Sequence, residues 1–191
     1  DQWCQYTQSV PIRFLMMGTV FYLLVCVQGP LQALRNVNEI TSKTDWIIGH
    51  AHMALFGAFT FFAIGAIYHV IPTMCKKPLW SKNLAEWHFN LNFLGAFLMF
   101  VSLFIGGFMQ GLEWAQWATG DSYAIFHRNL TQVSFLRTIG DMWYWWLFRG
   151  ISGVFILVGN LLFLLNMFNT IILKPRKQPQ ELETYTHKGE S

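Results

Sequence analysis

The stretch Thr44-Asp-Trp-Ile-Ile-Gly-His50-Ala-His52-Met-Ala-Leu-Phe56 places two histidines two residues apart at the start of a long apolar run. A helix turns by about 100° per residue, so His50 and His52 would leave nearly opposite faces of one helix. Zinc sites on a helix use histidines four residues apart, because that spacing brings both rings to one ion. The pair therefore predicts two separate planar metal cofactors, one on each side of the helix.

The composition is that of an integral membrane protein. Of 191 residues, 53% are hydrophobic and only 12% are charged, which is far from the balance of soluble domains. The net charge of +3 is small and scattered, with no basic run interleaved with aromatic residues, so nucleic acid is not an expected partner. The three cysteines form no C-x-x-C element, which excludes a zinc ribbon and covalent c-type haem attachment.

Apolar segments long enough to cross a bilayer, at about 20 residues each, predict an all-α protein with four transmembrane helices. Gly29 and Pro30 are expected to end the first helix, and Pro72 the second. Thr44 and Asp45 form an expected cap at the start of the second helix. The predicted helices are residues 11–29, 46–73, 88–112 and 141–173.

The basic residues predict how these helices lie across the membrane. The stretch from Cys75 to Lys82 contains three lysines, and three more basic residues directly follow the fourth helix. By the positive-inside rule both regions are cytoplasmic, and the connections 30–45 and 113–140 lie outside. We therefore expect the membrane region that would hold the two cofactors to cover 1–173, followed by a polar cytoplasmic tail over 174–191, with both termini in the cytoplasm.

This topology places His50 and His52 near the outer face, and both would need a partner in a medium without water. Haem iron supplies such a partner to each ring. His69 lies roughly 28 Å further along the helix, so it cannot join the same site. His69 and His88 are interpreted as hydrogen-bonded packing residues, and His127 falls in the outer loop. A six-coordinate haem would need its second ligand from outside this chain.

Arg149 is a charge inside the fourth apolar segment. A guanidinium beside haem would pair with propionate carboxylates, although an arginine that extends to the membrane surface is the alternative. The residues Gly49, Ala51, Ala54 and Gly57 keep the second helix slim. Close approach of a flat macrocycle and ordinary helix packing explain this equally well.

Several motifs together resemble the haem-copper oxidase superfamily, and within it the catalytic subunit I of cbb3-type (C-type) cytochrome c oxidases. The resemblance covers residues 10–173 and corresponds to the last four helices of a twelve-helix subunit. The motifs are Gln28-Gly-Pro30, Gly49-His50-Ala-His52, Tyr68-His69-Val-Ile-Pro72, Trp87-His88-Phe89, Gly107-Phe-Met-Gln-Gly-Leu-Glu-Trp114 and Arg149.

The resemblance implies a role for each residue of the pair. His50 would be the proximal ligand of the high-spin haem b3, where oxygen is reduced, and His52 one axial ligand of the low-spin haem b. Arg149 would be a propionate partner. The implied activity is reduction of oxygen to water, with electrons from c-type cytochromes and coupled proton translocation in a respiratory chain.

The chain also departs from the family pattern. Gln28 stands where relatives commonly have glutamate, and Ser42 where they often have histidine. The ligands of copper B and the second haem b ligand belong to earlier helices that this sequence does not contain. We therefore expect an enzyme that is active only with a chain or segment supplying the N-terminal helices, beside membrane-anchored c-type cytochrome subunits in the bacterial inner membrane.

Two alternatives remain open at this level. The run from His50 to Gly57 and the run from Tyr144 to Arg149 also resemble the large subunit of nitric-oxide reductase, which reduces nitric oxide to nitrous oxide. A non-catalytic membrane subunit that keeps the fold is the second alternative.

Overall fold

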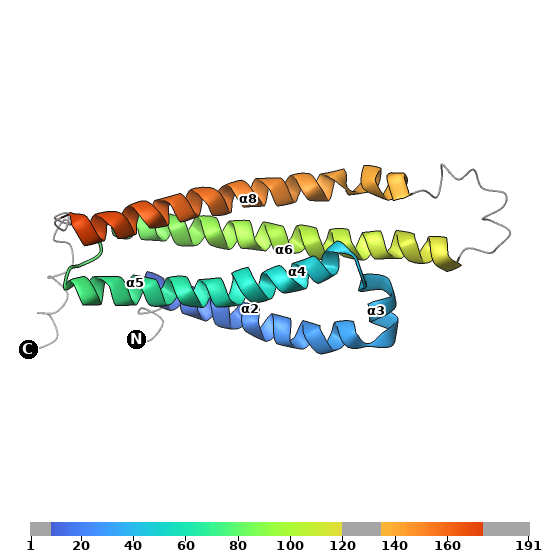
Figure 1. The fold of residues 1–191 in the computed structure, drawn as a ribbon, viewed down its shortest axis with the longest axis horizontal. Helices are drawn as coiled ribbons and strands as arrows, with labels where there is room; N and C mark the ends of the chain where they lie inside the picture. Colours follow the sequence, from blue (N-terminus) through green and yellow to red (C-terminus); the bar gives the residue numbers. More distant parts are fainter. Residues whose placement is uncertain (1–8, 120–134, 174–191) are drawn as a thin grey trace, which may run out of the picture.

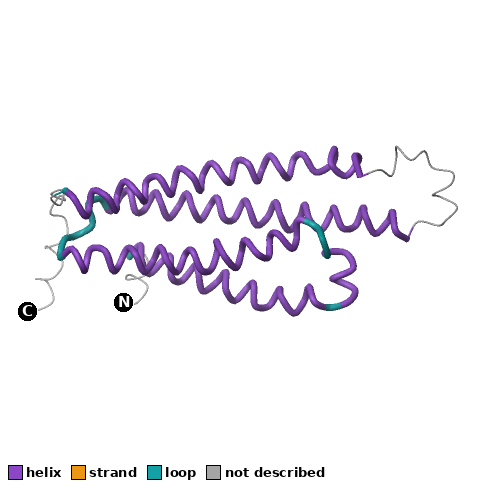
Figure 2. Tube along the Cα trace, viewed as in Figure 1, coloured by secondary structure: helices purple, strands orange, loops and turns teal. Residues whose placement is uncertain are grey.

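The computed structural model describes residues 9–119 and 135–173, with backbone alone for 115–119 and 135–137. Every regular element in these ranges is a helix, and long helices lie side by side along one axis (Figures 1 and 2). The elements are α2 (Val10–Ala33), α3 (Arg35–Thr41), α4 (Asp45–His52), the π-helical η1 (Met53–Thr60), α5 (Phe61–Cys75), α6 (Lys82–Thr119) and α8 (Phe135–Ile172). Because α4, η1 and α5 follow one another without a break, they form one continuous long helix.

Within the described residues, four stretches are long and apolar enough to cross a membrane, as predicted. Their large apolar side chains are extensively exposed, above all on α8, where only 22% of the most apolar window is buried. Such surface belongs in lipid or against other apolar helices. The stretches are Val10–Ala33, Asp45–Cys75, Lys82–Trp114 and Thr138–Ile172.

Two predicted helix ends were wrong. Pro30 lies inside α2, which continues to Ala33 and ends where Leu34 is extended. Pro72 lies inside α5, which ends at Cys75, where Lys76 adopts a left-handed conformation with φ 51°. A proline removes one helical hydrogen bond without ending a helix when the neighbouring turns hold it, which is common in membrane helices.

The other predicted bounds also shift. The helix α6 begins at Lys82 and continues to Thr119, and α8 begins at Phe135. Both therefore extend beyond the apolar windows, because helical hydrogen bonding continues into the polar flanks. The short helix α3 was not predicted at all.

The two ends of the bundle differ (Figure 1). We call the end that carries α3 and the start of α4 the α4 end. The other end carries the connection between α5 and α6, together with the start of α2 and the last turns of α8, and we call it the loop end. Between them, Phe14, Phe61 and Leu103 are the largest fully buried apolar side chains of α2, α5 and α6.

A pair of glycines on α6 positions the start of α4. A Cβ atom at Gly107 would collide with the backbone nitrogen of Trp46, and one at Gly111 with the backbone oxygen of Ile40. Residues four apart lie on one face of a helix, and small residues there let backbones approach closely. The pair Gly107 and Gly111 therefore seats the junction of α3 and α4 directly on α6.

Local hydrogen bonds then fix where α4 begins. Thr44 Oγ1 accepts from the Trp46 backbone nitrogen at 3.2 Å and donates to the Thr41 carbonyl at 2.7 Å. The backbone nitrogen of Asp45 donates to Gln110 Oε1 of α6 at 2.9 Å. The predicted cap is thus confirmed, and α6 satisfies a further amide of the first turn.

Candidate functional site

His50 lies in the second turn of α4, and its ring contacts α2. Its Nδ1 is 3.1 Å from Gln28 Oε1, a residue 22 positions earlier in the chain. An amide oxygen accepts, so Nδ1 carries the proton in this arrangement and Nε2 keeps its lone pair. The half-buried ring is therefore oriented by α2, and with the proton on Nδ1 its Nε2 can act as an acceptor.

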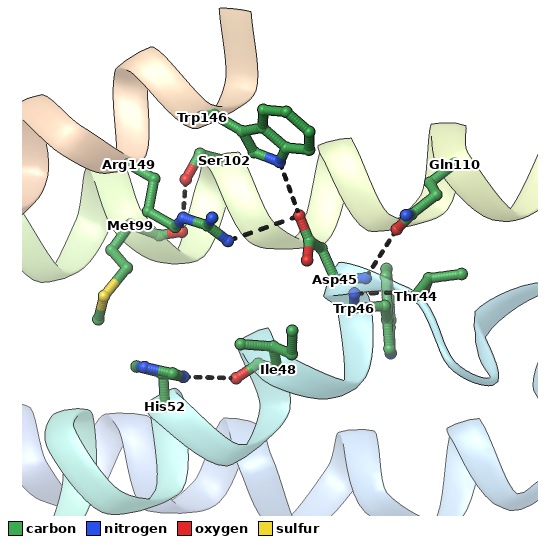
Figure 3. A network of polar contacts seen from close by, with 10 residues as sticks. All are labelled: Thr44, Asp45, Trp46, Ile48, His52, Met99, Ser102, Gln110, Trp146 and Arg149. Carbon is green, nitrogen blue, oxygen red and sulfur yellow. Dashed lines mark hydrogen bonds and ion pairs between the residues drawn. The ribbon is translucent and has the colours of Figure 1, made fainter. Parts of the chain in front are cut away.

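His52 is exposed and uses its own helix in the same way. Its Nδ1 is 2.8 Å from the Ile48 carbonyl oxygen (Figure 3). A carbonyl can only accept, so Nδ1 donates and Nε2 again keeps its lone pair. One ring contacts α2 and the other is exposed, so the two histidines leave α4 on different sides, as their spacing predicts.

The helix changes its winding directly after this pair. The segment η1 runs from Met53 to Thr60, and Thr60 Oγ1 donates to the Leu55 carbonyl at 2.9 Å. Turns of the π type are rare and occur often at functional sites. Nothing in the Ala-, Gly- and Phe-rich sequence of η1 distinguishes it from an α-helix, so residue patterns could not reveal it.

The two explanations for the small residues of this helix can now be separated. A Cβ atom at Gly49 would lie 2.9 Å from a ring carbon of Phe104, and one at Gly57 would lie 3.0 Å from Phe100. Both glycines are buried against α6 and α2, so helix packing accounts for them. Ala51, between the two histidines, is exposed. Unlike Gly49 and Gly57, it therefore lies on an open surface of the helix.

Arg149 reaches the start of α4 from α8. Its Nη1 is 3.6 Å from Asp45 Oδ2, and Trp146 Nε1 donates to the same oxygen at 3.4 Å (Figure 3). The Arg149 side chain remains 39% exposed and that of Asp45 16%. A guanidinium carries five N–H donors, so this ion pair leaves donors for a second carboxylate beside α4.

The remaining histidines lie elsewhere. His69 is exposed on α5. His88 is fully buried, and its Nδ1 lies 2.9 Å from the Tyr68 hydroxyl, as expected for a hydrogen-bonded packing residue. His127 and the tail 174–191 lie outside the described residues. In residues 9–119 and 135–173 there is no group of three or more His, Cys, Asp or Glu side chains that could hold one metal ion.

Three polar partners were missed by sequence reasoning. The sequence did not link Gln28 to His50 or Gln110 to the start of α4, and Asp45 was assigned to the helix cap and not to Arg149. Polar side chains inside apolar spans are the signal that could have drawn attention to both glutamines. Their partners depend on how the helices face one another, which residue spacing along one helix does not show.

Comparison with known proteins decides the family. The family model described as "Cytochrome C and Quinol oxidase polypeptide I" matches residues 2–155. The chain belongs to this family.

Its curated relatives are subunits of bacterial oxidases. The chain is 29% identical over 170 residues to the cytochrome c oxidase subunit 1 homolog of Azorhizobium caulinodans, covering 88% of this chain and 29% of the relative. It is 29% identical over 170 residues to the Cbb3-type cytochrome c oxidase subunit CcoN1 of Stutzerimonas stutzeri, covering 88% and 34%. For cytochrome c oxidase subunit 1 of Rhodobacter capsulatus the identity is 26% over 175 residues, covering 91% and 31%.

These matches confirm the resemblance to subunit I of haem-copper oxidases. The chain spans roughly a third of the length of these relatives. Together with its four apolar helices, this makes it a membrane-embedded part of an oxidase subunit I-like protein.

Proposed function

We propose that this chain is the haem-binding part of the catalytic subunit of a cbb3-like terminal oxidase. His50 binds the iron of high-spin haem b3, and His52 binds the iron of low-spin haem b. The observation that carries this proposal is that both Nδ1 atoms already face acceptors, Gln28 Oε1 and the Ile48 carbonyl. With the proton on Nδ1, both rings would therefore offer Nε2 lone pairs on different sides of one helix, which suits ligands of two separate haem irons.

The residues of α4 position the two ligands rather than react themselves. Gln28 of α2 holds the His50 ring, and the Ile48 carbonyl of α4 itself holds the His52 ring. Bound at these positions, the haems would supply oxygen binding and electron transfer. The backbone from His50 to His52 keeps the two ligands a fixed short distance apart, which favours electron transfer between the cofactors they hold.

Arg149 is proposed as a propionate partner. It lies at the α4 end, where it pairs with Asp45 in the first turn of the helix that carries both histidines. Charge-assisted, bidentate pairing with carboxylates is what a guanidinium does best, and the partial exposure of Arg149 leaves it accessible to such a group.

The rest of the enzyme is assigned to other helices. Copper B, its ligands and the second haem b ligand come from a chain or segment carrying the N-terminal helices, in keeping with the greater length of the relatives. Membrane-anchored c-type cytochromes deliver electrons, and oxygen reduction is coupled to proton translocation. The exposed Lys76 and Lys82 of the loop end face the cytoplasm of a bacterial inner membrane by the positive-inside rule, which puts His50 and His52 near the outer side.

Substitution of each histidine in the assembled complex tests the ligand assignment. We expect His50→Ala to abolish the carbon monoxide difference spectrum of the high-spin haem, and His52→Ala to abolish the low-spin haem b band. The matched control is His69→Ala, an exposed histidine on the same continuous helix, which should keep both signals. Haem spectra unchanged by both substitutions would leave only a non-catalytic subunit that keeps the fold.

The substrate is tested separately. Oxygen uptake by the complex, with copper present by metal analysis, would support the oxidase. Uptake of nitric oxide with non-haem iron in place of copper would overturn the oxidase assignment and favour nitric-oxide reductase, while leaving the two haem ligands in place.

A further inference from the structure

A second buried polar group lies away from the histidine pair, at the junction of α5, α6 and α8. His88 is 0% exposed there. Its ring packs against Phe14 and Phe163, with ring centroids 5.0 Å and 4.9 Å away. The Tyr68 hydroxyl is 2.9 Å from Nδ1. The imidazole is therefore enclosed by aromatic rings and has one polar contact at one of its two nitrogens.

Two polar atoms of α6 are left unsatisfied in this enclosure. Among the described residues, His88 Nε2 and Asn92 Oδ1 have no hydrogen-bond partner, although both residues are 0% exposed. Asn92 Nδ2 donates to the His88 carbonyl at 3.1 Å, which anchors the amide. Residues four apart are neighbours on one helix face. Burying such atoms without a partner is costly, because their bonds to water are lost and not replaced, so a hydrogen-bonding molecule is expected between them.

The facing helix α8 supplies both space and a third polar group. A Cβ atom at Gly159 would collide with Asn92 Nδ2, so only glycine at this position leaves room for the amide. The next residue, Asn160, interacts with the His88 ring from α8. Polar side chains of two helices, Asn92 of α6 and Asn160 of α8, therefore lie close to His88.

We propose that His88 Nε2, Asn92 Oδ1 and the Asn160 side chain bind an internal water molecule between α6 and α8. Water both donates and accepts, and buried waters usually make two to four hydrogen bonds. When Nδ1 donates to the Tyr68 hydroxyl, Nε2 is an acceptor like Asn92 Oδ1, and one water can donate to both. The group contains no carboxylate, so its chemistry suits a neutral water better than a cation.

The site continues toward the loop end through further polar side chains. Asn166 interacts with the Tyr68 hydroxyl. Asn166 also binds the backbone of Ser81, accepting from its nitrogen at 3.1 Å and donating to its oxygen at 2.9 Å. The chain from Ser81 through Asn166 and Tyr68 to His88 thus links the water to the connection between α5 and α6.

The water is tested by a structure of the assembled complex at a resolution that shows ordered water. We expect density within about 2.7–3.2 Å of both His88 Nε2 and Asn92 Oδ1, and its loss in Asn92→Leu. The matched control is Asn90→Leu, an exposed asparagine on the same helix, which should keep the density. If Asn92→Leu fails to assemble, Asn160→Ala serves instead and should shift or remove the water. A direct hydrogen bond from the Asn160 amide to Nε2, with no density between α6 and α8, would overturn the proposal.

This measurement does not require haem at His50 or His52, so the proposal stands or falls independently of the proposed function.

Discussion

The α4 end and the loop end use histidine in opposite ways. At the α4 end, His50 is half-buried and His52 is exposed. Nearer the loop end, in the second turn of α6, His88 is fully buried against aromatic rings. All three Nδ1 atoms have a polar contact, to Gln28, the Ile48 carbonyl and Tyr68 respectively.

The difference therefore lies in the surroundings of the second nitrogen. A histidine whose Nδ1 is occupied and whose ring is open can offer Nε2 to a metal, whereas an enclosed ring can bind only something as small as water. A polar residue within a membrane span marks a functional site by default. The comparison indicates that the accessibility of Nε2, rather than the type of residue, determines what a histidine of this chain can bind.

Gly111→Leu should break the α4 end most severely. The new side chain would meet the Ile40 carbonyl of α3, so α3 and α4 must move off α6, at a cost of about 3 kcal/mol or more. We expect a lower melting temperature of the purified complex and loss of both haem signals. Gly153→Ala is the control, because a Cβ atom there meets nothing within 4 Å. Equal melting temperatures for the two variants would show that the glycine pair does not position α4.

Gln28→Leu separates the two ligands of the α4 end. It removes the acceptor for His50 Nδ1 and leaves the carbonyl acceptor of His52 intact. Loss of such a supporting contact typically lowers metal affinity by roughly 10–100-fold, so high-spin haem should be lost preferentially. Haem content and the iron–histidine stretch in resonance Raman spectra measure this effect.

Two companion variants sharpen the Gln28 prediction. Gln28→Glu keeps an acceptor and should retain the high-spin haem, and Thr19→Val, at an exposed position of α2, should have no effect. Equal loss of both haems in Gln28→Leu would point to general unfolding of α2 instead of a specific effect on His50.

Thr44→Ala tests how firmly the first turn of α4 is held. It removes the bond from the Trp46 amide to Thr44 Oγ1, and loss of a helix cap costs about 1 kcal/mol. The melting temperature should fall by a few degrees with both haems retained. The control is Thr73→Ala at the loop end, where the exposed hydroxyl donates only to the His69 carbonyl of its own helix. A larger effect from Thr73→Ala would contradict the role assigned to the cap.

Arg149→Gln should have the smallest effect on stability. The ion pair with Asp45 is long and partly exposed, and such pairs contribute less than about 1 kcal/mol. A propionate partner would nevertheless change the haem midpoint potential, measured by redox titration, without moving the melting temperature. Arg35→Gln removes an equal charge from an exposed position at the same end and should leave the potential unchanged. Identical haem midpoint potentials in both variants would show that Arg149 does not pair with a propionate.

Much of the fold follows from local patterns. Apolar runs predicted the four membrane-spanning helices, since length and hydropathy suffice to identify a span. The spacing of His50 and His52 predicted rings on different sides, because a helix has a constant turn per residue. Pro30 and Pro72 were misread as stops, since a proline costs only one hydrogen bond and the continuing helix tolerates it.

The sequence by itself determined the spans, the cap at Thr44, the opposed histidines and the family. Only the tertiary structure decided which partners these residues meet: Gln28 for His50, Asp45 for Arg149, and Tyr68 for His88. The physical reason is that caps and helical turns arise from bonds between residues a few positions apart. Contacts between helices depend on their relative rotation and axial shift, which close packing of residues such as Gly107 and Gly111 sets.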